Sequence, residues 1–476
     1  MDNDQIIYDV AVIGAGVVGA AIARELSRYD LQCVLLEAGP DVGIGTSKAN
    51  TAVWHTGFDA KPGTLEARLL RRSYALLQEY VPEAGIPAEY LGAVLVAWTK
   101  DQQDALPGLL ERAHQNGVTD VRRLSRDEVY ELEPNLNQGA LGGLYVPGES
   151  VLCTYTLPLA LATQAVLNDV TLKLNHPVRD ILSEPDGTYV LDGPGGKVRC
   201  RYLVNAAGLY SDEIDRLLGH HDFTVVPRRG ELIVFDKMAR SLVNHILLPV
   251  PTAVSKGVLI SPTVYGNVML GPTAEDLNDK TETSSSAAGL RLLWQKGEAI
   301  LPRLLDEEVT AVYAGLRAAT EHADYQIRLH AAQRYVCVGG IRSTGVSSCL
   351  GIAEYVVELL GEAGLPLSPR KEFRPVRMPY IGEAGTRPYQ SPEMIATNPD
   401  YGRVICYCER VTLGEILDAL HAVIPARTLD GLKRRTRVLH GRCQGFHCHA
   451  AVAAVLARET GQSMGQVLML EDGDDA

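Results

Sequence analysis

The sequence lacks both a long apolar run and a basic N-terminus. A membrane-spanning helix needs about 20 consecutive apolar residues, and the longest candidate, residues 10–23, is short and interrupted by glycines. The chain begins Met1-Asp2-Asn3-Asp4, whereas a secretory signal begins with basic residues. We therefore expect a cytoplasmic protein without a transmembrane segment.

Positive charge and evenly spread cysteines are also scarce. The formal net charge is −13, which argues against general nucleic-acid binding. A length of 476 residues predicts two or three domains. Disulfides are not expected in a large cytoplasmic protein. Of the nine cysteines, four lie between Cys406 and Cys448, and this cluster indicates a metal or redox site.

The N-terminus has the pattern of a β-α-β unit that binds a dinucleotide. Residues 6–13 form an apolar run, residues 17–26 have helical spacing, and residues 33–36 form a second apolar run that ends at Glu37. The turn between the first two is G-x-G-x-x-G, with its glycines at Gly14, Gly16 and Gly19. Such glycines allow the backbone to approach a pyrophosphate, and the acidic residue is placed to bind a ribose hydroxyl.

The glycine motif alone does not separate FAD from NAD, but several later segments favour FAD. Small residues after Glu37 leave room for a long cofactor, and two further strand-like runs, 202–204 and 335–338, are each followed by small residues. The second precedes a helical run, 352–360, whose N-terminus could stabilise negative charge on a reduced flavin. The additional residues expected at the cofactor are Thr46, Ser47, Val178, Ala207, Gly208, Gly340, Thr344 and Gly345.

These runs predict two domains interleaved in sequence. We expect an α/β Rossmann-type FAD-binding domain from residues 1–85, 146–220 and 331–365, and an α+β substrate domain with a mixed sheet from residues 86–145 and 221–330. Seven of the chain's 25 prolines fall in residues 366–399, so residues 366–401 are predicted to be a linker. Residues 402–476 are predicted to be a small helical cysteine module.

The order of these segments resembles the superfamily of FAD-dependent oxidoreductases that includes D-amino acid oxidase and glycerol-3-phosphate dehydrogenase. Within it, the chain is most similar to the large subunit of anaerobic glycerol-3-phosphate dehydrogenase and its single-chain relatives. The phrases that carry this resemblance are PRRGE at 227–231, NVMLGPT at 267–273, AGLR at 314–317 and GIRSTG at 340–345. Residues 54–65 also resemble L-2-hydroxyglutarate dehydrogenases. Typical glycerol-phosphate enzymes have a lysine where Arg342 stands, and this difference leaves the substrate open.

Four residues are candidates for substrate chemistry. Arginine suits carboxylates and phosphates, and the resemblance implies that Arg317 holds an anionic group of the substrate. Arg342 precedes the last helix, next to the expected flavin. His55 is a candidate base or orienting residue, and a similar Trp-His phrase in dimethylglycine and sarcosine dehydrogenases attaches the flavin covalently. A packed histidine is an equal alternative. Arg229 is a substrate contact or a structural residue.

The clustered cysteines form two pairs, Cys406/Cys408 and Cys443/Cys448, with one and four intervening residues. Thiolates suit iron–sulfur clusters and zinc, but zinc sites prefer two to four residues between paired ligands. Residues 402–460 resemble the bacterioferritin-associated ferredoxin module, which implies a 2Fe–2S cluster on these four cysteines. Six basic residues and one acidic residue in 427–442 could offset the cluster's negative charge. The alternative is a solvated basic helix face.

We therefore predict a FAD-dependent dehydrogenase for a small anionic hydroxy compound, either glycerol 3-phosphate or a 2-hydroxy acid. Electrons would pass through the 2Fe–2S cluster to an electron-accepting subunit or a quinone-linked carrier, and such a partner could hold the protein at a membrane surface. An amine, D-amino-acid or opine dehydrogenase and a non-catalytic electron-transfer subunit are the alternatives.

Overall fold

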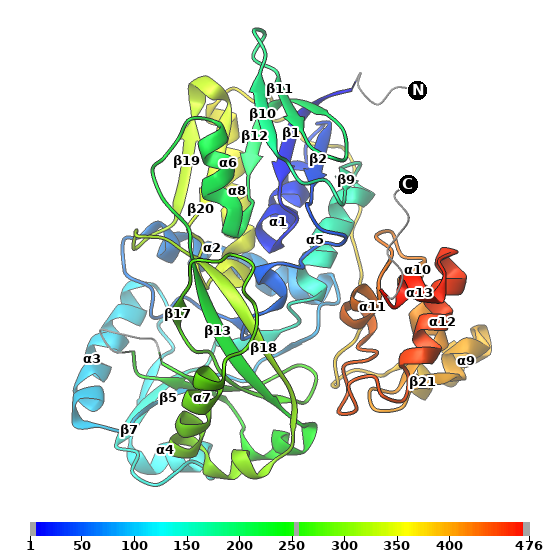
Figure 1. The fold of residues 1–476 in the computed structure, drawn as a ribbon. Helices are drawn as coiled ribbons and strands as arrows, with labels where there is room; N and C mark the ends of the chain where they lie inside the picture. The colour runs from blue at the N-terminus through cyan, green and yellow to red at the C-terminus, as the bar shows by residue number, and fades with distance from the viewer. Residues whose placement is uncertain (1–5, 252–256, 470–476) are drawn as a thin grey trace. The chain divides into compact units, whose positions relative to one another are not determined.

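The computed structural model describes residues 6–251 and 257–469, so the N-terminal residues Met1–Asp4 lie outside it. The chain divides into two compact units, Met1–Met378 and Pro379–Ala476 (Figure 1). The boundary falls inside the segment 366–401 that was predicted to be a linker. The later part of that segment belongs to the second unit and contains the helix α9 (Pro392–Thr397).

The first unit contains a largely parallel sheet built around the N-terminal strand. β1 (Ile7–Ile13) pairs in parallel with β2 (Cys33–Leu36) and with β12 (Val198–Asn205), and β12 pairs in parallel with β20 (Tyr335–Gly339). The two strand-like runs 202–204 and 335–338 thus both lie in the same sheet as the N-terminal strand. The remaining members are β9 (Thr171–Lys173), β10 (Asp180–Ser183), β11 (Tyr189–Asp192) and β19 (Gln326–His330).

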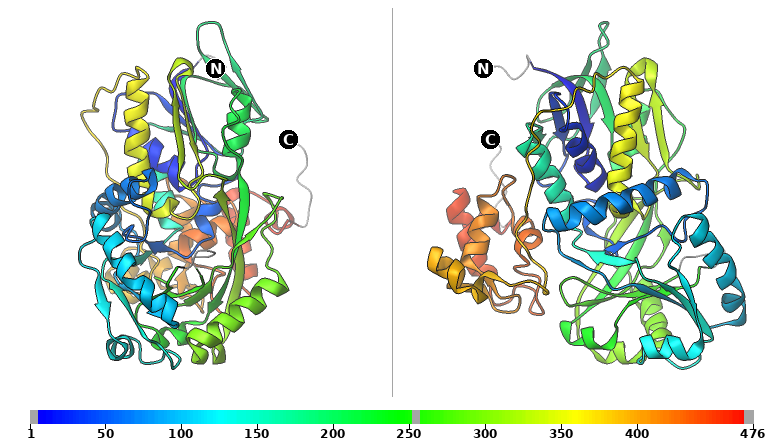
Figure 2. Two further views of the ribbon diagram at one scale, coloured as in Figure 1. Left: turned by 90° about the vertical axis from the view of Figure 1, so that its left-hand side faces the viewer. Right: turned by 180° about the vertical axis from the view of Figure 1, so that it is seen from behind.

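Apolar residues explain why these strands lie at the centre of the sheet. All four residues of β2 and all five of β20 are buried, as expected for parallel strands covered on both faces. The helices α1 (Val17–Leu26) and α8 (Gly345–Glu362) pack side by side, and α1 also contacts α5 (Thr156–Leu167) (Figure 2). In the sequence, α1 begins shortly after the carboxyl end of β1, and α8 begins after the loop that follows β20. The N-termini of both helices therefore lie near the carboxyl ends of parallel strands.

A second, mixed sheet forms the other half of this unit. Its longest strands, β13 (Val226–Phe235) and β18 (Val309–Ala319), pair antiparallel along their whole length, whereas β14 (Ile246–Pro249) pairs in parallel with β5 (Ala93–Ala97). Its apolar face packs against α4 (Arg126–Leu132) and α7 (Ala287–Ile300). The other strands are β6 (Arg122–Leu124), β7 (Gly142–Val146), β15 (Leu259–Pro262), β16 (Val268–Gly271) and β17 (Glu275–Asp276).

The two sheets take their strands from alternating stretches of the chain, which confirms the predicted interleaving and fold class. A small third sheet brings β3 (Val53–Trp54), β4 (Ala88–Glu89) and β8 (Ser150–Leu152) together. The long helix α2 (Leu65–Glu83) packs on α8. This third sheet places residue 55 and residue 149 side by side although 94 residues separate them.

The second unit is small and mostly helical. Its core contains two of the clustered cysteines, Cys406 and Cys448, packed among aliphatic side chains. Its elements are β21 (Val404–Cys406), β22 (Val411–Thr412), α10 (Leu413–Leu420), α11 (Leu429–Thr436), α12 (His449–Thr460) and α13 (Met464–Val467). Across the described parts of both units, no helix has the length and apolar character needed to cross a membrane.

Candidate active site

The glycine turn after β1 is as tight as the motif predicts. Gly14 has a φ of +100°, a conformation open to glycine, and a Cβ there would lie 2.5 Å from the Ala206 carbonyl oxygen. A Cβ on Gly19 would lie 1.8 Å from the Gly14 oxygen. A Cβ on Gly16 would meet only Ser47 Oγ, at 3.4 Å, and Gly16 lines a large cavity. The first and third glycines therefore allow close packing, and the second leaves the backbone open to a ligand.

Glu37 holds this turn through its side chain. Its Oε2 accepts a hydrogen bond from the Ala15 N–H at 2.8 Å, and its Oε1 accepts one from the Gly39 N–H at 2.9 Å. Burial raises the pKa of the Glu37 carboxyl. The residue also lines the cavity, so its carboxylate is placed as a ribose-binding acid requires.

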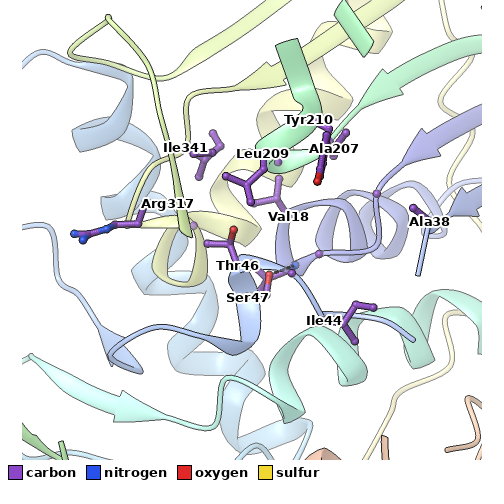
Figure 3. A pocket seen from close by; sticks show the side chains of 18 of the residues that line it. Val18, Ala38, Ile44, Thr46, Ser47, Ala207, Leu209, Tyr210, Arg317 and Ile341 are labelled. Atoms are coloured by element: carbon purple, nitrogen blue, oxygen red, sulfur yellow. Dashed lines mark hydrogen bonds between the residues drawn. The ribbon is translucent and has the colours of Figure 1, made fainter. Parts of the chain in front are cut away.

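A short 3-10 helix, η2 (Thr46–Lys48), closes one side of the cavity. Ser47 Oγ accepts a hydrogen bond from the Val17 N–H at 2.9 Å, and Thr46 Oγ1 donates one to the Leu316 carbonyl at 2.7 Å. These bonds tie η2 to α1 and to β18. Figure 3 shows Thr46 and Ser47 between Arg317 at one end of the labelled side chains and Ala38 at the other.

The cavity has a volume of about 820 Å³ and runs along the carboxyl ends of the parallel strands, where α/β sheets bind nucleotides. Of the residues predicted at the cofactor, Gly19, Gly340 and Thr344 do not line it. Those that do are Gly14, Gly16, Glu37, Thr46, Ser47, Val178, Ala207, Gly208 and Gly345. The prediction did not include Ile44, Asn50 and Tyr210, which also line the cavity.

The cavity fits FAD. The first turn of α1 has no acidic residue and its N-cap residue, Gly16, makes no side-chain cap bond; the Val17 N–H is bonded to Ser47 Oγ, and the positive end of the helix still faces the cavity where a pyrophosphate would lie. The N-terminus of α8 has the same two properties, and its first residues, Gly345 and Val346, line the cavity. One helix end would therefore hold the phosphates, while the other would face the flavin ring.

Arg317 on β18 is a cation without an acidic partner. Its Nη2 donates to the carbonyl oxygens of Thr273 at 2.5 Å and Arg229 at 3.3 Å, and no carboxylate in the described residues lies within ion-pairing distance. A Cβ on Gly230 would lie 2.8 Å from Nη2, so a larger residue there would shift the guanidinium. Burial, with the nearby Arg228, lowers the pKa of Arg317 to about 10. The residue lines the cavity.

Arg342 and Arg229 are paired, in contrast to Arg317. Arg342 lines the cavity in a left-handed conformation, φ +54°, and forms an ion pair with Glu66 of α2. Arg229 forms an ion pair with Glu275 at 2.6 Å, donates to the Ser284 carbonyl at 3.0 Å and does not line the cavity. The structure thus brings Arg317 and Arg342 to the cavity and places Arg229 on the opposite side of the strand.

His55 follows β3 and does not itself line the cavity, but its backbone is anchored to a residue next to the lining. Its backbone N–H donates to Ser347 Oγ at 2.9 Å, and Ser347 lies in the first turn of α8, next to the lining residue Val346. The imidazole Nδ1 lies 2.8 Å from Glu149 Oε2. Sequence reasoning missed Glu149, because no local motif marks a residue that meets its partner through the third sheet.

The four clustered cysteines converge in the second unit. The thiol of Cys408 interacts with that of Cys443, and the thiol of Cys406 with that of Cys448. Each contact joins one cysteine of the first sequence pair to one of the second. A 2Fe–2S cluster needs two thiolates on each of two irons, so two such contacts fit the cluster.

Backbone groups around Cys443 also fit a thiolate ligand. The N–H groups of His447, Gly445 and Phe446 lie near its sulfur, and chiefly that of His447 lowers the pKa of the Cys443 thiol. Hydrogen bonds to ligand sulfurs are a means by which proteins tune iron–sulfur clusters. Of the basic residues in 427–442, Arg437 forms a buried ion pair at 3.3 Å with Glu409, which follows Cys408.

Comparisons with known proteins find a matching family model for each of the two units. Residues 9–359 match the family described as FAD dependent oxidoreductase, and residues 404–458 match the BFD-like 2Fe–2S binding domain.

A glycerol 3-phosphate dehydrogenase from Caloramator mitchellensis is 36% identical over 97% of this chain and 96% of its own length. A bovine mitochondrial L-2-hydroxyglutarate dehydrogenase is 30% identical over 56% of this chain and 61% of its own length. The FAD-bound L-α-glycerophosphate oxidase structure from Mycoplasma pneumoniae superposes with a TM-score of 0.75 and 29% identity, covering 79% of this chain and all of that one. This chain therefore belongs to the FAD-dependent oxidoreductase family and carries a BFD-like 2Fe–2S domain after its flavin domain.

Proposed function

We propose that the protein oxidises a small hydroxy compound that carries an anionic group, with glycerol 3-phosphate or a 2-hydroxy acid as the substrate class. Arg317 is the observation that carries this proposal: a partly buried guanidinium at the cavity, bonded to carbonyl oxygens and not to a carboxylate. The similarity to a glycerol 3-phosphate dehydrogenase over almost the whole chain supports the same class.

Two of the four candidate residues have a task in this proposal. Arg317 binds the anionic group and so fixes the position of the carbon to be oxidised. His55, anchored by Ser347, accepts the proton of the substrate hydroxyl. Bound FAD supplies the acceptor for the hydride equivalent. We further propose that the electrons leave singly through the 2Fe–2S cluster to a one-electron partner.

An anaerobic substrate screen tests the proposal directly. Purified protein is mixed under nitrogen with glycerol 3-phosphate, L-2-hydroxyglutarate, D-amino acids and glycine, and bleaching of the flavin absorbance is followed. We expect bleaching by an anionic hydroxy compound. Bleaching by amino compounds alone would favour the amine dehydrogenase alternative, and bleaching by none of a broad panel would favour an electron-transfer subunit.

Replacing Arg317 by Met should raise the KM for the anionic substrate by about 10- to 150-fold, because one charge-assisted contact of roughly 1.5–3 kcal/mol is lost.

In the wild type, the pKa of Arg317 near 10 predicts that KM rises once the pH exceeds that value, since the neutral side chain no longer attracts an anion. Steady-state kinetics between pH 7 and 10.5 measure both effects.

In Arg317→Met, the KM for the anionic substrate should not rise across the same pH range, because the side chain that loses its charge is absent. Arg122→Met removes an exposed arginine from β6, at the far edge of the sheet, and should leave KM unchanged. Equal KM values for the anionic substrate and an uncharged analogue in the wild type would contradict the assignment.

Exchanging Glu37 for Arg should release FAD. The variant loses the carboxylate that faces the cavity and the two backbone hydrogen bonds that hold the turn. FAD content per chain, measured by absorbance after gel filtration, should fall well below that of the wild type. Glu111→Arg makes the same charge change on the exposed surface of α3 (Lys100–Gln115) and should retain full FAD. Full occupancy in Glu37→Arg would show that Glu37 is not needed for binding.

A further inference from the structure

Glu149 is a completely buried carboxylate whose hydrogen-bond donors all come from one short segment. It precedes β8, its side chain has 0% exposure, and no lysine or arginine in the described residues pairs with it. Oε1 accepts hydrogen bonds from the Thr56 N–H at 2.7 Å and Thr56 Oγ1 at 2.8 Å. Oε2 lies 2.8 Å from His55 Nδ1. A buried carboxylate is costly unless it is fully hydrogen-bonded, and here His55 and Thr56 supply these bonds.

This arrangement determines which nitrogen of His55 carries the proton. An ionised carboxylate only accepts hydrogen bonds, so Nδ1 must be the protonated nitrogen. The lone pair of the neutral ring is then on Nε2. A histidine in this tautomer can accept a proton at Nε2, and the adjacent carboxylate stabilises the imidazolium that forms.

The His55–Glu149 pair, here called the dyad, is also fixed through the backbone of His55, which is bonded to α8. The His55 N–H donates to Ser347 Oγ, and Ser347 Oγ also bonds to the Val53 carbonyl at 3.3 Å. Trp54, between them, has no exposed surface. The histidine is therefore held from both ends, by the N-terminus of α8 and by Glu149.

We propose that Glu149 is the positioning residue that makes His55 a base, an inference that rests on the proposed function. The substrate O–H proton moves to His55 Nε2 while the C–H bond breaks and its electron pair leaves as a hydride for FAD. The C–O bond becomes a carbonyl. Glu149 stays ionised and keeps the proton on Nδ1 throughout.

The test is Glu149→Gln, which preserves shape but reverses one hydrogen bond. Its amide oxygen can still accept from Thr56, while its NH₂ group points at His55 Nδ1 and favours the tautomer with the proton on Nε2. A general base contributes about 10²–10⁴-fold, so we expect kcat to fall at least about 10-fold, with KM and FAD content nearly unchanged. The acidic limb of the kcat/KM pH profile should move to lower pH.

Two comparisons separate this role from a structural one. In a His55→Gln background, adding Glu149→Gln should not lower kcat any further, because the glutamate acts through the histidine. Glu133→Gln is the matched control: Glu133 is also buried and lies 2.9 Å from His245 Nδ1, but His245 is not anchored to α8, whose first residues line the cavity, and activity should persist. An equal loss in both backgrounds, or a loss that follows FAD content, would overturn the proposal.

A measurement without substrate keeps this inference distinct from the proposed function. Nitrogen-15 NMR of the histidine rings, assigned by comparison with His55→Gln, should show His55 protonated at Nδ1 in the wild type and at Nε2 in Glu149→Gln. If this pattern appears but no hydroxy compound bleaches the flavin, the substrate class is wrong and the dyad stands. A wild-type His55 without a proton on Nδ1 would refute the dyad itself.

Discussion

Replacing Cys443 and Cys448 together by serine should leave substrate bleaching of the flavin intact but stop electron transfer to cytochrome c. The variant removes one thiol from each of the two contacts, Cys408/Cys443 and Cys406/Cys448, so only two of the four thiolates that would hold the cluster remain. The flavin chemistry belongs to the other unit and should continue in a single turnover. Stopped-flow absorbance under nitrogen measures the first step, and cytochrome c reduction measures the second.

The cluster itself provides an independent readout. Anaerobically reconstituted wild type should bind about two irons per chain and give a rhombic paramagnetic signal on reduction, and the double variant should give neither. Cys33→Ala removes a buried thiol from β2 of the first unit and should keep the signal. Normal cytochrome c reduction by an iron-free double variant would refute electron export through the cluster.

Exchanging His55 for Gln should lower kcat by about 10²–10⁴-fold, the usual contribution of a general base. Substrate binding through Arg317 should persist, so KM should change little. Anaerobic single-turnover bleaching measures the loss directly, because it isolates the chemical step from reoxidation.

Acid precipitation separates the two chemical roles that the sequence left open for His55. Complete release of FAD into the supernatant would exclude covalent attachment at this residue, and retention in the wild type but not in His55→Gln would establish it. Undiminished single-turnover bleaching in His55→Gln would show that the histidine is not the base.

The sequence was most informative where the chemistry is local. Gly14, Gly16 and Gly19 act within one turn, so their spacing predicts a site that the structure places at the cavity. The four cysteines were predicted as a set, but the cross-pairing was not, because it depends on how two distant loops meet. Arg342 shows the same limit: its partner Glu66 is 276 residues away.

Sequence patterns could not predict the role of Glu149 for a related reason. Glu149 lies in an ordinary turn between β7 and β8, and only the pairing of β3 with β8 brings it to His55. Burial supplies the functional signal, since a carboxylate with no exposure and no cationic partner must find its donors nearby. That signal exists only in three dimensions.

The interleaved sheets also bear on how the chain is made. β1 ends at Ile13, yet it pairs with β12, which begins at Val198, and β12 pairs with β20, which ends at Gly339. The ribosome therefore synthesises most of the chain before all the strands that complete the sheet around β1 exist. Sheets with strands so distant in sequence fold slowly, and the edges of the strands made first stay exposed in the meantime. Nascent chains shorter than about 340 residues should need chaperone protection and should hold no flavin, so the cofactor would be acquired late in translation or after release.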